Sequence, residues 1–184
     1  QLLKTTRFDG YWERGKPYLD AYNIHYITDI TTTALTFLSG ELDEVSNLDA
    51  AEASNLMQKG YKNQSVPNVI GVLYPDSVNA DSPFAKQKVR EAIEYALDRV
   101  GIAKALGYGL WQPANQIALT SYAHVPDLKG RTYDPAKAKQ LLAEAGYPAG
   151  FKTSLNSGSQ PMRETLVGFA TNLRDVGIDV PITQ

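Results

Sequence analysis

The chain has 184 residues, of which 43% are hydrophobic and 21% are charged, a composition typical of a globular protein long enough to bury a core. Its formal net charge of -2 gives no general attraction to nucleic acid or to an anionic membrane surface. The lack of cysteine excludes disulfides, thiolate zinc sites and cysteine nucleophiles, and no apolar run approaches the roughly 20 residues of a membrane helix.

Charge is distributed unevenly along the chain. Residues 1–66 hold six Lys and Arg against nine Asp and Glu, whereas residues 67–184 hold twelve against eleven. This shift indicates that two lobes meet near Pro67.

The first strand is predicted at residues 22–28, where apolar and polar side chains alternate. Alternation is typical of a strand with one buried face, formed here by Tyr22, Ile24 and Tyr26.

Two short helices are expected next. One covers residues 32–39 and is followed by Gly40, which suits the left-handed position after a last helical turn. The other covers residues 50–58, and Asp49 with Glu52 resembles its capping box.

A second strand is predicted from Val69 to Tyr74, a continuous apolar run between Pro67 and Pro75. Such a run is typical of a strand buried on both faces.

A long amphipathic helix should follow, with Ser82 as its cap and Pro83 at its first position. Its inward face repeats at the spacing of one helical stripe: Val89, Ala92, Ile93, Ala96, Leu97 and Val100.

The last part of the chain alternates helices and strands. Asp134 should cap a helix that begins at Pro135 and ends at Gly146. Its inward residues are Ala138, Leu141, Leu142 and Ala145. Strands are expected at 151–156 and 178–183, on either side of a helix at 161–176 whose inward residues are Leu166, Phe169, Ala170 and Leu173. This order predicts a mixed α/β (α+β) fold.

Residues for catalysis are scarce. His25 and His124 are the only histidines, and about 100 residues separate them. A structural or surface role is favoured for His25 and a structural role for His124, although His124 lies in a loop and could reach a ligand. Neither a metal-binding HExxH spacing nor a GxSxG nucleophile elbow is present. The sequence Gly107-Tyr108-Gly109 follows a predicted helix rather than a strand, which favours a helix stop over a dinucleotide fingerprint.

Binding residues gather in the loop at 107–122. Tyr108, Trp111, Gln112 and Asn115 combine aromatic rings with amides, the usual lining of a pocket for a polar molecule with some apolar surface. The alternative is that Trp111 only packs on the core of its lobe.

Two further turns are candidates. Asn79 lies after the predicted strand 69–74, where ligands of α/β sheets often bind, although Asp76 and Ser82 there are better explained by a turn and a helix cap. In the second turn, Asn156, Ser157 and Arg163 lie between a strand and a helix start, whose free N–H groups could meet a carboxylate. A solvated Arg163 is the competing interpretation.

Several stretches together resemble extracellular solute-binding protein family 5, which serves peptide and nickel ABC transporters. They are FDGYWERGKPYLD (8–20), YITDITTTALTFLSGELDEV (26–45), PFAKQKVREAIEYALDR (83–99), GYGLWQPANQ (107–116), YDPAKAKQLLAEAGYPAGF (133–151) and LRDVGIDV (173–180). Their order and spacing are specific as a set. Family members are more than twice as long, so the chain resembles a fragment, and FDGYW replaces the asparagine and proline that many members carry before YW.

The resemblance implies part of a two-lobed, type II periplasmic-binding-protein architecture, with residues 1–66 in the first lobe and 67–184 in the second large lobe. It implies capture of a peptide, or of another small solute such as a nickel chelate or sugar, and delivery to an ABC permease. The two lobes would close over the ligand. The protein would be periplasmic or a lipid-anchored surface protein, with its export signal before Gln1. The aromatic-lined pocket implied by the family matches Trp111 with its neighbours and the turn at 156–163. No cofactor, metal or nucleic acid is expected.

Two other functions stay open. The scarcity of catalytic residues weighs against a hydrolase. A protein-interaction module would use exposed apolar faces to bind a partner or to dimerise, and a fragment could self-associate through the same faces.

Overall fold

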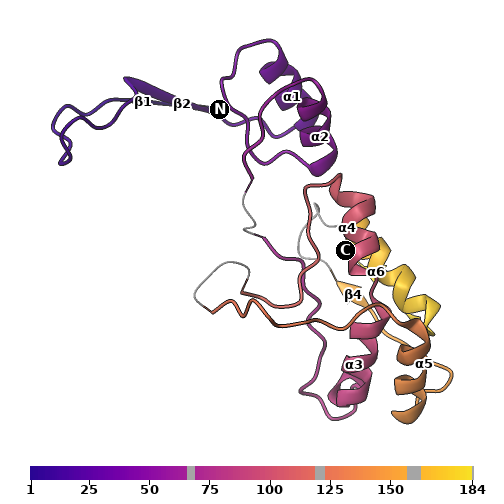
Figure 1. Cartoon of the computed structure of the whole chain (residues 1–184). Helices are drawn as coiled ribbons and strands as arrows, with labels where there is room; N and C mark the ends of the chain where they lie inside the picture. The colour runs from indigo at the N-terminus through magenta and orange to yellow at the C-terminus, as the bar shows by residue number, and fades with distance from the viewer. Residues whose placement is uncertain (66–68, 119–122, 157–162, 184) are drawn as a thin grey trace. The chain divides into compact units, whose positions relative to one another are not determined.

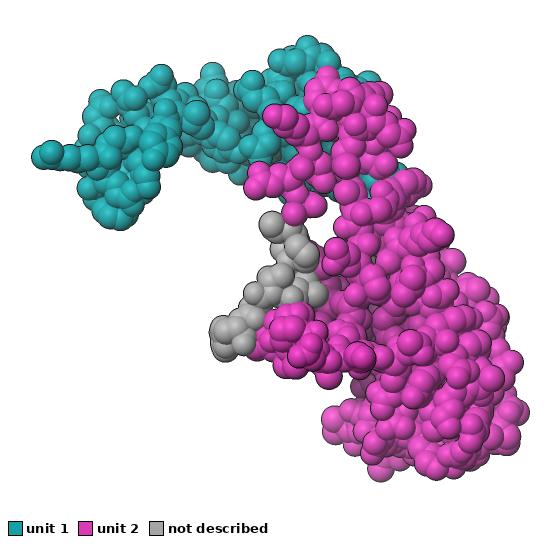
Figure 2. Space-filling view, viewed as in Figure 1, with its two compact units in different colours: residues 1–52 teal, residues 53–184 magenta. Residues whose placement is uncertain are grey.

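The computed structural model describes residues 1–65, 69–118, 123–156 and 163–183. The chain forms two compact units, Gln1–Glu52 and Ala53–Gln184, which Figure 2 shows in teal and magenta. The predicted assignment of residues 1–66 and 67–184 to two lobes remains a prediction.

The first unit opens with an antiparallel hairpin of β1 (Leu2–Thr6) and β2 (Ala21–His25). Leu2 pairs with His25, and Thr6 pairs with Ala21. The strand predicted at 22–28 is therefore present but starts earlier, and its partner β1 was not predicted. The expected buried face is wrong, because Tyr22 and Tyr26 are 51% and 56% exposed. A two-stranded hairpin needs another layer to cover one face, and burial at β1 and β2 shows no such layer among the described residues.

Two short helices follow the hairpin, and the second of them crosses the boundary between the two units. In α1 (Ile30–Leu38), the Asp29 carboxylate accepts a hydrogen bond from the Thr32 N–H at 2.7 Å, so the helix begins two residues before the predicted start. Gly40 follows with φ 81°, as its left-handed position requires. In α2 (Ala50–Gln58), Asp49 accepts from the Glu52 N–H, also at 2.7 Å.

The long helix expected after Ser82 is divided into three pieces. Ser82 caps a short 3-10 helix, η1 (Pro83–Ala85), which leads into α3 (Gln87–Ala96). Leu97 then takes an extended conformation, and α4 (Arg99–Gly107) begins.

The break lies at Asp98 because this side chain starts a new helix. Its carboxylate accepts from the Gly101 N–H at 2.8 Å, and its own N–H donates to the Asn172 side chain at 3.0 Å. The single amphipathic face was therefore an incorrect prediction at its end: Leu97 is buried, but Val100 is 66% exposed.

The next two helices confirm the predicted pattern. Asp134 caps α5 (Pro135–Glu144), and α6 (Arg163–Asp175) presents its predicted apolar face to the core. Gly146 and Gly177 follow them with φ 91° and 96°. The core combines α3, α5, α6 and the last strands, and its largest fully buried side chains are Val89, Leu142, Ile178 and Val180.

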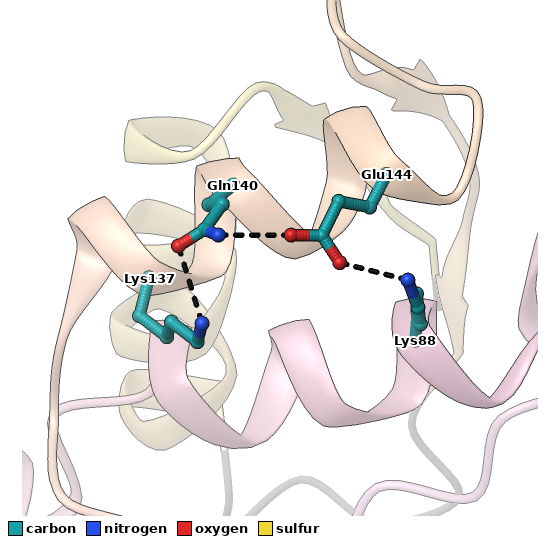
Figure 3. A network of polar contacts seen from close by, with 4 residues as sticks. All are labelled: Lys88, Lys137, Gln140 and Glu144. Atoms are coloured by element: carbon teal, nitrogen blue, oxygen red, sulfur yellow. Dashed lines mark hydrogen bonds and ion pairs between the residues drawn. The ribbon is translucent and has the colours of Figure 1, made fainter.

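Polar contacts join α3 to α5 at the surface (Figure 3). Lys88 donates to Glu144 at 2.8 Å, and Gln140 donates to the other oxygen of the same carboxylate at 2.8 Å. Lys137 donates to Gln140 at 3.1 Å. The two hydrogen bonds to Glu144 lower the pKa of its carboxyl below the usual value, with the Lys88 bond as the larger cause.

The strands predicted at 151–156 and 178–183 run side by side and parallel, each in two pieces. β3 (Phe151–Lys152) pairs with β5 (Ile178–Asp179), and β4 (Leu155–Asn156) pairs with β6 (Ile182–Thr183). The backbones approach closely before β3, where a Cβ on Gly150 would lie 1.8 Å from the Gly177 carbonyl oxygen.

The strand predicted from Val69 to Tyr74 is absent. The segment has no regular secondary structure and belongs to none of the described sheets, and Val69 and Tyr74 are 75% and 83% exposed. A strand forms only where a neighbouring strand supplies backbone hydrogen bonds, and hydrophobicity alone does not supply them. Leu73 nevertheless packs against the core.

Candidate functional site

The predicted binding loop begins where α4 ends, at Gly107. Tyr108 has the left-handed φ of 49° and Gly109 a φ of 84°, and the Leu110 N–H donates to the Gly107 carbonyl oxygen at 2.7 Å. The predicted helix stop and turn are thus confirmed. This geometry sends the chain away from α4.

Trp111 packs directly on the end of α4. A Cβ added to Gly107 would lie 2.5 Å from the Trp111 Cβ and 2.7 Å from its Cγ, so the indole needs a residue without a side chain beneath it. Trp111 lies outside the buried core cluster and stays 43% exposed, and Tyr108 is 57% exposed. Both aromatic rings therefore keep surface that a solute can contact.

The amides farther along the loop bond to its returning half. The Gln116 amide nitrogen donates to the Val125 carbonyl oxygen at 2.9 Å, and the Gln116 oxygen accepts from the Val125 N–H at 2.9 Å. The Asn115 amide nitrogen donates to the Leu128 carbonyl oxygen. Gln112, in contrast, is exposed. Nothing in the sequence around Gln116 signals its partner, because both bonds go to backbone groups.

His124 also takes part in holding the loop. Its Nδ1 lies 2.8 Å from the Ala118 carbonyl oxygen, which makes it a donor to that oxygen. The structural role favoured for this histidine agrees with the contact.

The second candidate turn lies between β4 and α6. Asn156 is exposed at the end of β4, and Arg163 is exposed at the start of α6. Ser157 lies outside the described residues. Arg163 also lines a shallow depression of about 490 Å³ between α4 and α6, together with Asp98, Ile102, Val167 and other residues of the two helices.

Asn79 lies in a third place, a turn built on Asp76. The Asn79 amide donates to one Asp76 carboxylate oxygen at 2.7 Å, and the backbone N–H groups of Val78 and Asn79 approach the other. These hydrogen bonds, led by the Asn79 side chain, lower the Asp76 pKa below its usual value. The predicted turn at Asp76 and the cap at Ser82 are both present. The candidate residues thus come from three separate segments.

Across the described ranges, no group of three or more His, Asp or Glu side chains could hold a metal ion. None of the helices within these described ranges is both long and apolar enough to cross a membrane.

The fold of this chain resembles solved structures of one class of protein, the periplasmic binding proteins. A periplasmic binding protein from A. tumefaciens R10, AgaA in complex with agropinic acid, superposes with a TM-score of 0.74 at 29% identity, over 99% of this chain and 38% of that protein. The Helicobacter pylori protein DppA, solved with the peptide STSA, gives a TM-score of 0.72 at 26% identity, over 100% of this chain and 36% of that protein. The predicted class, a mixed α/β chain with part of the two-lobed, type II architecture, is confirmed.

The model of the bacterial extracellular solute-binding proteins, family 5 (middle region), matches residues 1–184, and the chain belongs to this family. The glutathione-binding protein GsiB of Salmonella paratyphi A is 33% identical over 99% of this chain. GsiB of Escherichia coli K12 is 32% identical over the same share. The chain spans about a third, 36%, of the length of these relatives.

Proposed function

We propose that this chain is part of the substrate-binding component of an ABC transporter, and that the protein captures a peptide or a similar small solute for import. The observation that carries the proposal is the family match across residues 1–184. Two relatives support the choice of solute, since one is named a glutathione-binding protein and another was solved with a peptide. Glutathione is itself a small peptide.

The exposed side chains at the start of the loop form the first wall of the binding site. Tyr108 and Trp111 offer ring faces to apolar parts of a solute, and Gln112 offers an amide that can donate and accept. Asn115 supports this wall. Aromatic and amide groups bind a peptide without forming a covalent bond. We therefore propose that the protein binds its solute and does not convert it.

The second wall is proposed at the end of β4 and the start of α6. Arg163 stands in the first turn of α6, where its positive charge and the free N–H groups of the helix both favour a carboxylate. Asn156 and Ser157 precede it in the sequence and are the polar candidates beside it, and Asn79 supplies a further polar contact. A solute that touches residues of both lobes, 1–66 and 67–184, stabilises the closed state over the open one.

The partner and the compartment follow from the same role. The intact protein works outside the cytoplasmic membrane, either free in the periplasm or held by a lipid anchor, and delivers its solute to an ABC permease. The permease recognises the closed, loaded state.

Calorimetry on the intact solute-binding protein that contains this chain tests the proposal. The probes are reduced glutathione and the peptide Ser-Thr-Ser-Ala, and free glycine is the negative control. We expect one probe to bind with one molecule per protein. Binding of neither peptide, together with a co-purifying solute of another chemical class by native mass spectrometry, would contradict the peptide assignment.

A second candidate function, self-association, is favoured by one observation. The connection between β1 and β2 in the first unit exposes several large apolar side chains: Phe8 at 67%, Trp12 at 79%, Tyr18 at 81% and Leu19 at 61%. Such exposure is typical of surfaces that other protein covers. Light scattering separates the two functions, because a dimer of the 184-residue chain that is absent from the intact protein indicates an artificial contact.

A further inference from the structure

The loop that carries Trp111 belongs to a longer arm, residues 107–134, which leaves α4 and returns to α5 (Figure 1). Apart from its middle, residues 119–122, the arm is described. The arm has an outgoing leg, residues 108–118, and a returning leg, residues 123–134. The outgoing leg has no regular secondary structure and exposes apolar side chains such as Ile117, which is 70% exposed. A segment of this kind keeps one conformation only if specific side chains hold it.

The outgoing leg is attached at its start. The Trp111 side chain lies against Gly107, at the last residue of α4, and the turn hydrogen bond from Leu110 closes this corner at 2.7 Å. The end of α4 therefore fixes the position of the Trp111 side chain on one side.

The returning leg is attached to α3. The Arg131 guanidinium pairs with Glu91 at 3.3 Å and lies over the Tyr95 ring, 5.7 Å from its centroid. The Asp134 N–H donates to the Tyr95 carbonyl oxygen at 2.8 Å. Both ends of the arm thus contact helices of the unit Ala53–Gln184: the start contacts α4, and the end contacts α3.

Between these ends, the two legs are joined by an amide clasp, which consists of Asn115 and Gln116 on the outgoing leg and Val125, Leu128 and Gly130 on the returning leg. Gln116 uses both its donor and its acceptor on Val125, each at 2.9 Å. Asn115 donates to the Leu128 carbonyl oxygen, and its Cβ lies so near the returning leg that a Cβ on Gly130 would come within 2.7 Å of it. No strand pairing joins the described parts of the two legs, and the clasp connects them instead.

We propose that Gln116 is a positioning residue, which fixes the outgoing leg so that Trp111 and Gln112 face a solute in a prepared arrangement. A prepared arm loses less conformational entropy when a solute binds than a free arm does. This inference rests on the proposed function, because it gives Gln116 a role in the affinity of that site. Asn115 shares this role, because its amide nitrogen donates to the Leu128 carbonyl oxygen.

Hydrogen exchange tests the clasp without any ligand. Gln116→Ala removes the acceptor of the Val125 N–H, so the exchange of this amide should become about fivefold faster, as expected for the loss of one exposed hydrogen bond. Gln116→Glu keeps the acceptor and loses the donor, so Val125 should stay protected. Gln58→Glu, in α2, is the matched control and should leave Val125 unchanged. Equal exchange in the Ala variant and the unsubstituted protein would overturn the clasp.

Affinity tests the positioning role in the intact protein, with reduced glutathione and Ser-Thr-Ser-Ala as probes. Gln116→Ala should lower the affinity for whichever probe binds by about 3- to 10-fold, while the Tm changes by less than about 2 °C. The same substitution should have a smaller effect in a Trp111→Ala background, because part of its effect passes through that side chain and the rest through Gln112. An additive loss in the double variant, or a loss matched by a large fall in Tm, would overturn the positioning role.

The failure of the proposed function is distinguishable from a failure of the clasp. If the unsubstituted protein binds neither probe, the role of Gln116 toward these solutes fails with the proposed function. The exchange of Val125 still decides whether Gln116 holds the arm.

Discussion

The contact between Gly107 and Trp111 gives the sharpest test of the arm's geometry. Gly107→Ala adds a Cβ that would stand 2.5 Å from the Trp111 Cβ, well inside van der Waals contact. Gly107 does not have a positive φ, so the backbone itself accepts alanine without strain. The atoms in the way are the first atoms of the Trp111 side chain rather than its flexible end. The start of the arm must therefore move.

The size of the effect follows from the burial of Trp111. The residue is 43% exposed, so more than half of its surface is covered. That corresponds to about 100–150 Å² of mainly apolar area, or about 3 kcal/mol if all of it were lost. Partial relief of an overpacked contact costs about 1–3 kcal/mol, and the better helix propensity of alanine returns at most about 1 kcal/mol. We expect a net loss of about 1–2 kcal/mol in the free energy of unfolding.

Tryptophan fluorescence is the assay, since the chain has only two tryptophans and Trp12→Phe leaves Trp111 as the sole reporter. Gly107→Ala should shift the Trp111 emission to the red and lower the urea midpoint. Gly168→Ala is the control, because its Cβ would lie 3.2 Å from the Ile102 Cγ1, which a shift of a few tenths of an ångström relieves. Unchanged emission together with unchanged stability in Gly107→Ala would refute the packing of Trp111 on α4.

Two further predictions concern the helical unit. Asp98→Ala removes the cap of α4 and should lower the free energy of unfolding by about 1 kcal/mol in urea melts; no loss would show that the break between α3 and α4 does not depend on this cap. Lys88→Met removes the main cause of the lowered Glu144 pKa, so an NMR titration should find that pKa raised toward its usual value. A carboxyl group whose pKa is lower in the folded state stabilises the fold at pH values above its usual pKa. This stabilisation is lost as the pH falls through the lowered pKa. The stability difference between Lys88→Met and the unsubstituted protein should therefore shrink in acid. A difference independent of pH would contradict this assignment.

Local signals in the sequence predict the helices well. The cap at Asp134, the apolar spacing up to Ala145 and the stop at Gly146 are all properties of neighbouring residues, and α5 forms as they indicate. The break at Asp98 was missed because the apolar stripe continues through it in the sequence, while the competing cap is a single side chain. Capping took precedence over periodicity there.

Strands are harder to predict because they depend on distant partners. The run from Val69 to Tyr74 has the composition of a buried strand, but its state depends on which strand pairs with it, and that information is not local. The same limit applies to the arm. Aromatic and amide residues predict a candidate site in the loop at 107–122, yet the bonds from Gln116 to Val125 appear only in three dimensions.

Native mass spectrometry of the intact solute-binding protein, purified without refolding, tests the central claim most directly. The account predicts one bound small solute per protein, of peptide or peptide-like mass, whose occupancy falls in Trp111→Ala while the Tm stays within about 2 °C. A Trp12→Phe variant should keep the solute. A protein that carries no solute and binds neither reduced glutathione nor Ser-Thr-Ser-Ala would contradict the proposed function. Undiminished occupancy in Trp111→Ala with a large fall in Tm would place Trp111 in the fold and outside the site.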